Sequence, residues 1–426
     1  MGLSSDITSC SSLTIRPGAL HGTVDAIPSK SVAHRALVCS ALAPTPTTLL
    51  GRLDGEDVQA TRRCLDTLLS AKRGPDAPAL PQGENALPLL DCGESGTTLR
   101  FMLPVAAALG GGACFTGRGR LGERPLTGLL QTLTAHGITC RTPAHGGFPL
   151  EIRGRLTGNR FSIDAGTSSQ YVSGLLLALP LLGHSATLAL EGTPASKPYI
   201  DLTLAVMETF GVHVQSTAGG YRLEGPKTYQ GPSTLSLEGD WSNAAPWLVG
   251  AALSGSVSVR GLQPQSAQGD RILFQLLRQM GAATQYQNGM HTVQQRPLHA
   301  LDYDATHTPD IVPLLALACA SAQGVSHLTG VARLRAKESD RLAAVVEVLS
   351  CQGIRCTASD EVLEIEGGTL QGGPLPVYND HRMVMMEVIS GLVAARPVTV
   401  QTQSITKSYP QFVLDFQSIG GNIYGI

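Results

Sequence analysis

The stretch RAKESDRL, Arg335 to Leu342, places two arginines, a lysine and two carboxylates within eight residues. The rest of the chain is poor in charge, since only 15% of its 426 residues are Asp, Glu, Lys or Arg, against about 25% in an ordinary soluble domain. Cations that hold a phosphate or carboxylate, beside a carboxylate that moves a proton, would need this mixture. A solvated helix face is the alternative, and the stretch alone leaves both open.

Other basic side chains stand in turns beside Gly, Ser or Pro, just ahead of apolar segments, where binding groups often lie. Arg grips a phosphate or carboxylate through two parallel hydrogen bonds, and Lys acts as a compact point charge. Cations from several such turns would suit a ligand with more than one anionic group, whereas each one alone fits the protein surface equally well. The set comprises Lys30, Arg35, Arg100, Arg124, Lys197, Lys337, Arg341, Arg382 and Lys407.

Two carboxylates accompany these cations, Asp310 at an expected helix start and Glu338 next to Lys337. Proton transfer near neutral pH needs carboxyl groups whose surroundings push their pKa values apart. Either residue alone is more commonly a helix cap or an ion-pair partner. The residues by themselves therefore indicate an anion-lined cleft with candidate acid and base groups, and no more.

The elements that must position these groups repeat along the chain. Six places share one design, a polar turn followed at once by a helix rich in Ala, Leu and Gly, and their polar residues recur every 66 to 74 positions. A period of this kind indicates an internal repeat, and six repeats of about 71 residues account for all 426. The marker residues of the six turns are Ser29, Ser95, Ser168, Ser242, Asp310 and Asp380.

Each repeat also carries strand-like alternations that close with Gly, such as ATLALEG and VLEIEG, and most carry a second helix, such as EDVQATRRCLDTLLSA. This pattern predicts an α/β fold, and the chain length predicts two domains of three repeats each. A helix start offers unpaired N–H groups and about half a positive charge, so six starts could bind anions. Simple N-capping is the alternative reason for the polar residues there.

The composition argues against several classes of function. A net charge of −2 and a pI near 6.6 give no overall attraction to nucleic acid or to an anionic membrane. The first residues, MGLSSDITSCSSL, lack the features of a signal peptide. The longest apolar runs are shorter than the roughly 20 residues of a spanning helix. We therefore expect a soluble, cytoplasmic protein.

Patterns for metals and organic cofactors are missing from the sequence. The nine Cys stand singly without a CxxC pair, and the 11 His show no metal-ligand spacing, so reduced thiols and no metal are expected. GRGRLG, from Gly117 to Gly122, matches GxGxxG, but no Asp or Glu occurs from Arg124 to Leu150, where a dinucleotide site needs one. A GxxxxGK[ST] phosphate loop does not occur either, and no cofactor is expected.

Ten motifs together resemble one known family. SKSVAHRAL, GESGTTLR, ERPL, SSQYVSG, SKPYIDLTL, GDWSNA, the DIVP segment after His307, RAKESDR, NDHRM and TKSYPQF occur in the order and spacing of the 5-enolpyruvylshikimate-3-phosphate synthases, from about Pro28 to the C-terminus. The resemblance implies a two-domain inside-out α/β barrel, in which each domain holds three βαβαββ repeats. The expected domains are residues 1–27 plus 240–426, carrying the Asp310 and Glu338 half of the site, and 28–239, carrying the Lys30, Arg124 and Ser168 half.

Members of this family transfer the enolpyruvyl group of phosphoenolpyruvate to the 5-hydroxyl of shikimate 3-phosphate and release phosphate, without metal or cofactor. The resemblance implies that Asp310 accepts the hydroxyl proton and Glu338 protonates the methylene carbon, with Lys30 sharing these roles. Shikimate 3-phosphate would contact Lys30, Ser31, Arg35, Ser168, Ser169, Gln170, Ser196, Tyr199, Asp310 and Lys337. Phosphoenolpyruvate would contact Lys30, Gly96, Arg124, Gln170, Arg341, Arg382 and Lys407. A monomer that binds these small molecules, and neither nucleic acid nor membrane, is expected.

The resemblance divides RAKESDRL by residue. Lys337 becomes a phosphate contact, Glu338 a proton donor and Arg341 a carboxylate clamp, because the apolar helix is expected to begin only after Asp340. Arg335 and Asp340 are expected to be ion-pair partners that hold the others in place.

The chain departs from the family pattern at four positions near the expected site. The usual Asn-Ala-Gly-Thr reads Glu94-Ser95-Gly96-Thr97, which adds a carboxylate near a phosphate site, although Gly96 is intact. Phe101 replaces a common Pro, and Arg333 stands where many members carry an Asn that contacts shikimate 3-phosphate. These changes bear on the affinity for phosphoenolpyruvate and for the inhibitor glyphosate.

Three other functions remain to be weighed. UDP-N-acetylglucosamine enolpyruvyl transferase shares the repeat fold, but its usual reactive Cys falls on Gly119 here. RNA 3′-phosphate cyclase uses similar repeats, but it predicts a basic groove that a pI near 6.6 does not suggest. A non-catalytic anion-binding protein would keep its function when Glu338 is replaced by Gln.

Overall fold

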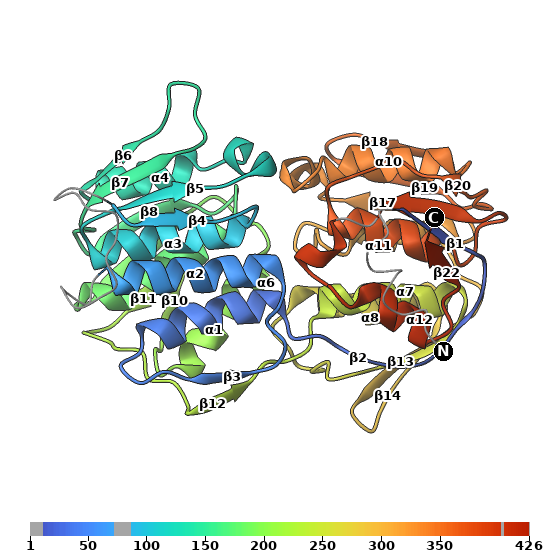
Figure 1. Cartoon of the computed structure of the whole chain (residues 1–426), viewed down its shortest axis with the longest axis horizontal. Helices are drawn as coiled ribbons and strands as arrows, with labels where there is room; N and C mark the ends of the chain where they lie inside the picture. The colour runs from blue at the N-terminus through green and yellow to red at the C-terminus, as the bar shows by residue number, and fades with distance from the viewer. Residues whose placement is uncertain (1–11, 72–86, 402–403, 426) are drawn as a thin grey trace. The chain divides into compact units, whose positions relative to one another are not determined.

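The computed structural model describes residues 12–71, 87–401 and 404–425. The chain folds into two compact units, which we call the terminal unit (Met1–Ser29 with Glu238–Ile426) and the central unit (Lys30–Leu237). The chain therefore passes from the terminal unit to the central unit and returns once. Figure 1 colours the central unit from blue to green, and most of the terminal unit from yellow to red.

The central unit contains six described helices: α1 (Lys30–Leu42), α2 (Glu56–Ser70), α3 (Gly96–Leu109), α4 (Thr127–Ala135), α5 (Ser169–Ala178) and α6 (Lys197–Thr209). Its described strands are β3 (Thr48–Leu50), β4 (Leu89–Asp91), β5 (Ala113–Thr116), β6 (Ile138–Arg141), β7 (Leu150–Gly154), β8 (Arg160–Asp164), β9 (Ala186–Glu191), β10 (Gln215–Thr217), β11 (Gly220–Leu223) and β12 (Thr234–Ser236). The first helix of every repeat begins within three residues of its predicted polar turn.

The terminal unit also contains six described helices: α7 (Trp241–Leu253), α8 (Ile272–Gln279), α9 (Val312–Ala320), α10 (Arg341–Cys351), α11 (His381–Ser390) and α12 (Phe412–Ser418). Its described strands are β1 (Ser12–Ile15), β2 (Leu20–Asp25), β13 (Gly255–Arg260), β14 (Ala283–Gln287), β15 (Met290–Gln294), β16 (Asp302–Asp304), β17 (Val325–Thr329), β18 (Cys356–Ala358), β19 (Val362–Glu366), β20 (Gly373–Pro374), β21 (Val398–Gln401) and β22 (Ile423–Gly425).

Five four-stranded sheets share one pattern, a parallel pair followed by two antiparallel strands, as in the order β4-β5-β7-β6. With the helices between the strands, this gives the repeat βαβαββ. Three repeats contain a strand from far along the chain. β2 pairs in parallel with β13, and β12 pairs in parallel with β3 in a two-stranded sheet. In the sheet β20-β21-β1-β22, the strand β1 from the start of the chain completes the last repeat. The predicted fold of three βαβαββ repeats per domain is confirmed.

The first helix of each repeat lies in the interior. Every residue of α7, α9 and α11 is buried, as are most residues of α1, α3 and α5. A helix that is apolar on all sides needs such burial, and the sheets then cover the helices. Figure 1 shows this layering in the central unit, where α1, α2 and α3 lie between the β4–β5 strands and the β3–β12 pair. This is the inside-out arrangement expected.

The interior helices of the central unit run parallel in matched register. Arg35 donates from Nη2 to Ser173 Oγ at 3.5 Å, and a Cβ added to Gly174 would meet the carbonyl oxygen of Arg100. All four residues stand four or five positions after the first residue of their helices. The starts of α1, α3 and α5 therefore lie at one end of the unit.

The terminal unit repeats this arrangement. Near the helix starts, Arg382 donates from Nη1 to the Ser242 carbonyl at 2.6 Å, and near the ends a Cβ on Gly250 would contact Ile389. Parallel helix starts at one end concentrate unpaired N–H groups and positive dipole ends, as an anion site requires.

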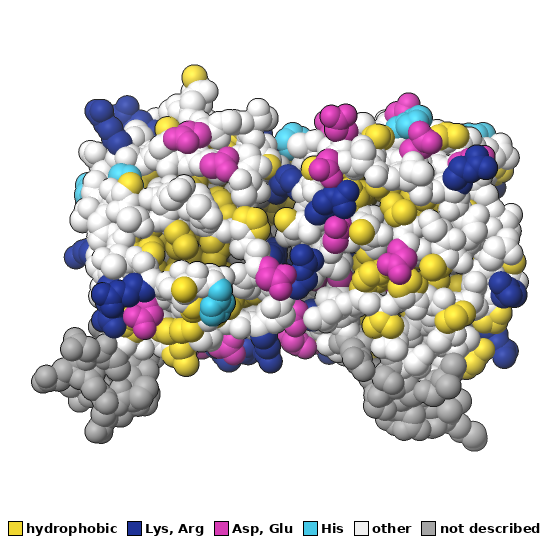
Figure 2. Space-filling model, turned by 90° about the horizontal axis from the view of Figure 1, so that it is seen from above, with side chains coloured by type: hydrophobic (Ala, Val, Ile, Leu, Met, Phe, Trp, Pro, Cys, Tyr) yellow, Lys and Arg dark blue, Asp and Glu magenta, His cyan; other side chains and the backbone are white. Residues whose placement is uncertain are grey.

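The described surface is sparsely charged. Figure 2 shows basic and acidic side chains dispersed among neutral atoms on the face in view. In the part of the chain that the structure describes, no helix combines the length and the apolar character needed to cross a membrane.

Candidate active site

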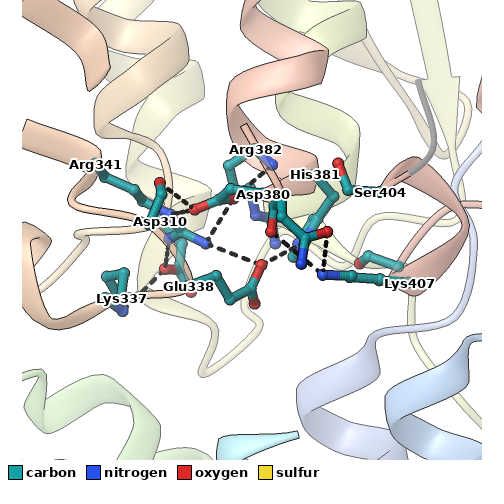
Figure 3. A network of polar contacts seen from close by, with 12 residues as sticks. Asp310, Lys337, Glu338, Arg341, Asp380, His381, Arg382, Ser404 and Lys407 are labelled. Carbon is teal, nitrogen blue, oxygen red and sulfur yellow. Dashed lines mark hydrogen bonds and ion pairs between the residues drawn. The ribbon is translucent and has the colours of Figure 1, made fainter. Parts of the chain in front are cut away.

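Arg341 is the centre of a buried ion-pair cluster in the terminal unit (Figure 3). It is the first residue of α10, and its guanidinium donates from Nη1 to Asp310 at 2.7 Å. It also donates from Nε and Nη2 to the two oxygens of Asp380 at 2.7 and 3.2 Å. Glu338 Oε2 lies 3.8 Å from Nη2. One cation thus organises three carboxylates contributed by the starts of α9, α10 and α11.

Asp310 and Lys337 form a second pair in the same cluster, with 3.0 Å between Lys337 Nζ and Asp310 Oδ1. Burial alone would raise the pKa of Asp310, but Lys337, Arg341 and Arg382 outweigh it and hold the pKa well below the usual range. Burial lowers the pKa of Lys337 to about 8, against the raising effect of Asp310. At neutral pH the carboxylate is therefore ionised, and the lysine titrates only slightly above that pH.

Glu338 faces the start of α11. Its Oε2 lies 2.9 Å from His381 Nδ1, and possible ligand atoms of Glu338, Asp380 and His381 all lie within 4.8 Å of one another. Such a group has the donor types of a divalent-cation site. Here the guanidinium of Arg341 already brings a positive charge to two of the three residues, so the cluster does not require a metal for charge balance.

Arg382 and Lys407 both donate hydrogen bonds to backbone and amide oxygens. Arg382 donates to the Ser242 carbonyl at 2.6 Å and is 4% exposed. Lys407 donates from Nζ to the side-chain and backbone oxygens of Asn379 at 2.8 and 3.2 Å. Both cations lie near the start of α11, where their positive charges would attract an anion (Figure 3).

Gly96 is the corresponding point in the central unit, at the start of α3. A Cβ there would lie 2.5 Å from Arg100 Nη1 and 2.6 Å from Arg124 Nη1. Burial lowers the pKa of Arg100 to about 10, and the nearby charge of Arg124 adds to this lowering. Two guanidinium groups that repel each other beside the buried Gly96 would be stabilised by an anion between them.

The start of α5 joins this cluster through Gln170. Its Oε1 accepts from Arg100 Nη1 at 3.2 Å, and its Nε2 donates to Thr97 Oγ1 at 2.8 Å. Ser168 caps α5 by accepting from the Gln170 N–H at 3.3 Å, and Ser169 is buried in the first turn. Ser168 therefore stabilises the start of α5, and Gln170 links it to α3.

Lys30 begins α1 and pairs with Asp57 of α2 at 3.0 Å, with both side chains less than one fifth exposed. Ser31 is half-buried beside it and lends its carbonyl to Arg35 Nη1 at 2.7 Å. Arg35 is 2% exposed and also donates to Thr203 Oγ1 at 2.7 Å and to the Tyr199 carbonyl at 2.9 Å. The structure thus commits much of Arg35 to protein oxygens.

Ser196 and Tyr199 lie at the start of α6. Ser196 is 2% exposed and adopts a left-handed conformation with φ 52°, while Tyr199 is half-buried. Neighbouring Lys197, one of the cations noted in the sequence, instead pairs with Asp201 at 2.6 Å on the surface. Lys197 therefore belongs to the solvated surface rather than to the cluster.

RAKESDRL contains the N-cap of α10 and an exposed ion pair. Asp340 caps α10 by accepting from the Ala343 N–H at 3.0 Å, so the helix begins after it. Arg335 is exposed and pairs with Asp340 at 3.2 Å and Asp360 at 2.7 Å. The expectation that Arg335 and Asp340 are ion-pair partners is confirmed.

Each of the four residues that depart from the family pattern has identifiable contacts in the structure. Glu94 packs over Gly119, where a Cβ would lie 2.9 Å from the Glu94 carboxylate, and Gly119 has φ +58°. Ser95 is the N-cap of α3 and accepts from the Thr98 N–H at 3.1 Å. Phe101 is fully buried, with the Arg35 guanidinium 5.1 Å from its ring centroid. The charge of half-buried Arg333 contributes to lowering the pKa of Lys337, behind burial and Arg341.

Several partners of the site residues were not predicted from the sequence. Asp57 holds Lys30, Asp380 holds Arg341, and His381 contacts Glu338. Asp380 and His381 lie within the NDHRM motif, so their motif position was a usable signal. Asp57 carries no such signal, because its pairing depends on how α2 packs beside α1.

The fold and the two clusters define a class of repeat-built α/β proteins that gather cations at parallel helix starts to bind multiply charged small anions. A model of the family described as EPSP synthase (3-phosphoshikimate 1-carboxyvinyltransferase) matches residues 15–416. The chain belongs to this family.

Individual relatives agree with the family match. The 3-phosphoshikimate 1-carboxyvinyltransferase of Clostridium kluyveri is 34% identical over 420 residues, which cover 96% of this chain and 98% of the relative. That of Clostridium acetobutylicum is 32% identical, covering 96% and 97%. The solved EPSP synthase of Acinetobacter baumannii superimposes with a TM-score of 0.78 at 25% identity, covering 97% of this chain and 99% of the other. The resemblance seen in the motifs is confirmed.

Proposed function

We propose that the chain is a 3-phosphoshikimate 1-carboxyvinyltransferase, which transfers the enolpyruvyl group of phosphoenolpyruvate to the 5-hydroxyl of shikimate 3-phosphate and releases phosphate. The family match over residues 15–416 carries this proposal. The reaction adds the hydroxyl to the enol carbon and then eliminates phosphate from a tetrahedral intermediate. It therefore needs a proton acceptor, a proton donor, and cations around two phosphates and two carboxylates.

Shikimate 3-phosphate is assigned to the serine-rich helix starts of the central unit and to one pair in the terminal unit. The hydroxyls and N–H groups at the starts of α5 and α6 suit a phosphate, and Lys337 adds a point charge. Arg35, being buried, supports Ser31 and Tyr199 through their carbonyls. The assigned residues are Lys30, Ser31, Arg35, Ser168, Ser169, Gln170, Ser196, Tyr199, Asp310 and Lys337.

Phosphoenolpyruvate is assigned to the two guanidinium-rich helix starts. Gly96 lets an anion approach the backbone between Arg100 and Arg124. Arg341, which donates to Asp310 and Asp380, would bind the carboxylate of the substrate by exchanging one of these contacts. Arg382 and Lys407 supply positive charge beside the start of α11. The assigned residues are Lys30, Gly96, Arg124, Gln170, Arg341, Arg382 and Lys407.

Asp310 is assigned as the proton acceptor and Glu338 as the proton donor. The low pKa of Asp310, set by Lys337 and the two arginines against the effect of burial, keeps it ionised and able to accept a hydrogen bond from the hydroxyl. Glu338 is within 2.9 Å of His381, a neighbour through which its proton could be replaced. Lys30, held by Asp57, is assigned to share in these transfers.

Phosphate release distinguishes this function from its alternatives. The protein is mixed with phosphoenolpyruvate and either shikimate 3-phosphate or UDP-N-acetylglucosamine, and released phosphate is measured. Release only with shikimate 3-phosphate is expected. Release only with the UDP-sugar, or salt-sensitive RNA binding without turnover, would overturn the proposal. A monomeric, cytoplasmic enzyme without metal or organic cofactor remains our prediction.

Replacing Gly96 by Ala is expected to raise the KM for phosphoenolpyruvate by about tenfold, with a smaller change for shikimate 3-phosphate. The added methyl would lie within 2.6 Å of two guanidinium nitrogens, so both groups must move from their positions. Steady-state kinetics with each substrate varied in turn measures the effect. Gly219→Ala is the matched control, because a Cβ at Gly219 meets no atom within 4 Å. Equal KM values in both variants would contradict the assignment.

The KM for shikimate 3-phosphate is expected to rise as the pH increases through about 8, the pKa to which burial lowers Lys337. A lysine is charged below its pKa and neutral above it, so the phosphate loses a cation at alkaline pH. Initial rates between about pH 7 and 9.5 would show the change, and Lys337→Arg should flatten it because Arg stays charged. A wild-type KM that is constant over this range would exclude Lys337 as the phosphate contact.

A further inference from the structure

A buried chain of hydrogen bonds joins α1, α2 and α3 behind Lys30. His34 Nδ1 lies 2.7 Å from Thr61 Oγ1, which lies 2.6 Å from Thr98 Oγ1. Thr98 Oγ1 then lies 2.7 Å from Ser95 Oγ. The four side chains are at most 1% exposed. A polar chain held away from water is costly unless its hydrogen bonds are made, so it fixes the three helices in one arrangement.

This chain of hydrogen bonds includes the second of two matched contacts between α1 and α2. Lys30 and His34 are four residues apart on α1, and Asp57 and Thr61 are four residues apart on α2, so each pair shares a helix face. Lys30 bonds to Asp57 at 3.0 Å, and His34 bonds to Thr61 at 2.7 Å. Thr98 links the two contacts, because its hydroxyl also lies 3.3 Å from the Asp57 carbonyl. The contact between His34 and Thr61 thus fixes the helical turn that presents Asp57 to Lys30.

The direction of the hydrogen bonds follows from counting hydrogens. The Asp57 carbonyl can only accept, so Thr98 gives its one hydroxyl hydrogen to Asp57 or Ser95 and must accept from Thr61. Thr61 then accepts from His34 Nδ1. The opposite direction would leave a buried Nε2–H without an acceptor, since Nε2 of His34 has no hydrogen-bond partner, and an orphaned donor is the rarer outcome.

His34 fills this role as a neutral ring. Burial lowers its pKa to about 3, with Asp57 opposing and Lys30 and Arg35 adding to the effect. A neutral histidine donates to Thr61 without competing with Lys30 for the negative charge of Asp57.

We propose that His34 is a positioning residue for Lys30: through Thr61 and Thr98 it fixes Asp57, and Asp57 holds the Lys30 ammonium in its working position. This inference rests on the proposed function, in which Lys30 contacts both substrates. Ser95 is the last residue of the hydrogen-bond chain. It stands where the family pattern has Ala, so this protein carries a hydrogen-bond acceptor that the usual residue lacks.

Thr61→Val tests the proposal, because it keeps the shape and removes the hydroxyl. We expect kcat/KM for shikimate 3-phosphate to fall by about 10 to 100-fold, as a displaced catalytic group does, and Thr61→Ser to restore it. Thr132→Val is the matched control: Thr132 is also a buried threonine of the central unit, but its hydroxyl bonds to the Ser162 and Gly128 carbonyls. Thr61→Val could instead have a lower melting temperature than Thr132→Val but the same kcat/KM. That result would show that the hydrogen-bond chain has only a structural role, and it would overturn the proposal.

A double-mutant cycle tests the route through Asp57. If Thr61 acts by fixing Asp57, adding Thr61→Val to Asp57→Asn should change kcat/KM by less than twofold; additive losses would refute that route. Lys30 can also be followed without activity, by its rate of acetylation measured by peptide mass spectrometry with Lys197 as internal reference. Faster acetylation of Lys30 in Thr61→Val but not in Thr132→Val supports the proposal, and equal rates overturn it. An inactive wild type would count against the proposed function alone, since the acetylation result stands independently.

Discussion

Glu338→Gln is expected to lower kcat by about 10² to 10⁴-fold, the usual contribution of a positioned proton donor. The amide keeps the size of the carboxyl group and can still hydrogen-bond to His381, which lies 2.9 Å away. It cannot give a proton to the methylene carbon of phosphoenolpyruvate. Because Arg341 is 3.8 Å away and retains Asp310 and Asp380, the cation cluster should persist. KM and binding of both substrates should therefore change by only a few-fold.

The measurement is steady-state phosphate release together with calorimetric binding of shikimate 3-phosphate. Glu361→Gln is the matched control, since Glu361 is an exposed residue twenty-three positions further along the same unit. A control with full activity and a Glu338→Gln enzyme with intact binding but lost turnover would support proton donation. Unchanged turnover in Glu338→Gln would instead favour a non-catalytic anion-binding protein.

The sequence predicted the elements that present the site better than it predicted the contacts within it. Polar residues before apolar helices located the starts of α1, α3, α5, α7 and α11, because capping is a local property. The start of α9 shows the limit. Asp310 was expected at that helix start, yet α9 begins at Val312 and Asp310 bonds to Lys337 and Arg341. Those partners are 27 and 31 residues away, and local spacing cannot reveal them.

Burial was the second property hidden from the sequence. Arg35 and Arg124 both precede or open apolar segments, but Arg35 is 2% exposed and bonded to α6 oxygens, whereas Arg124 is half-buried beside Gly96. Only the packing of α1 against α5 and α6 separates the two roles. The short helix α12 was likewise not predicted, because seven residues give too little periodicity to recognise.

Replacing Arg341 by Met is expected to destabilise the terminal unit by about 3 to 5 kcal/mol, the usual cost of removing one partner from a buried ion pair. Asp380 has a fully buried side chain and would lose its ion pair with Arg341, while Asp310 would keep its ion pair with Lys337. Arg335→Met, the same substitution at an exposed arginine six positions earlier in the same stretch, should cost less than about 1 kcal/mol. Both tryptophans, Trp241 and Trp247, lie in α7, so urea unfolding followed by tryptophan fluorescence reports on this unit.

The loss of stability in Arg341→Met is expected to depend on pH. In the wild type the pKa of Asp380 is lowered, because Arg341 and His381 outweigh the raising effects of burial and Glu338. Such a carboxylate stabilises the fold above its unfolded pKa of about 3.9, and that stabilisation is lost as the pH falls through the lower folded pKa. Without Arg341, burial raises the pKa instead, and protonation relieves the unpaired charge. The difference between wild type and Arg341→Met should therefore be largest near neutral pH and narrow below about pH 4. A difference that stays constant with pH would mean that Arg341 stabilises the unit by packing alone.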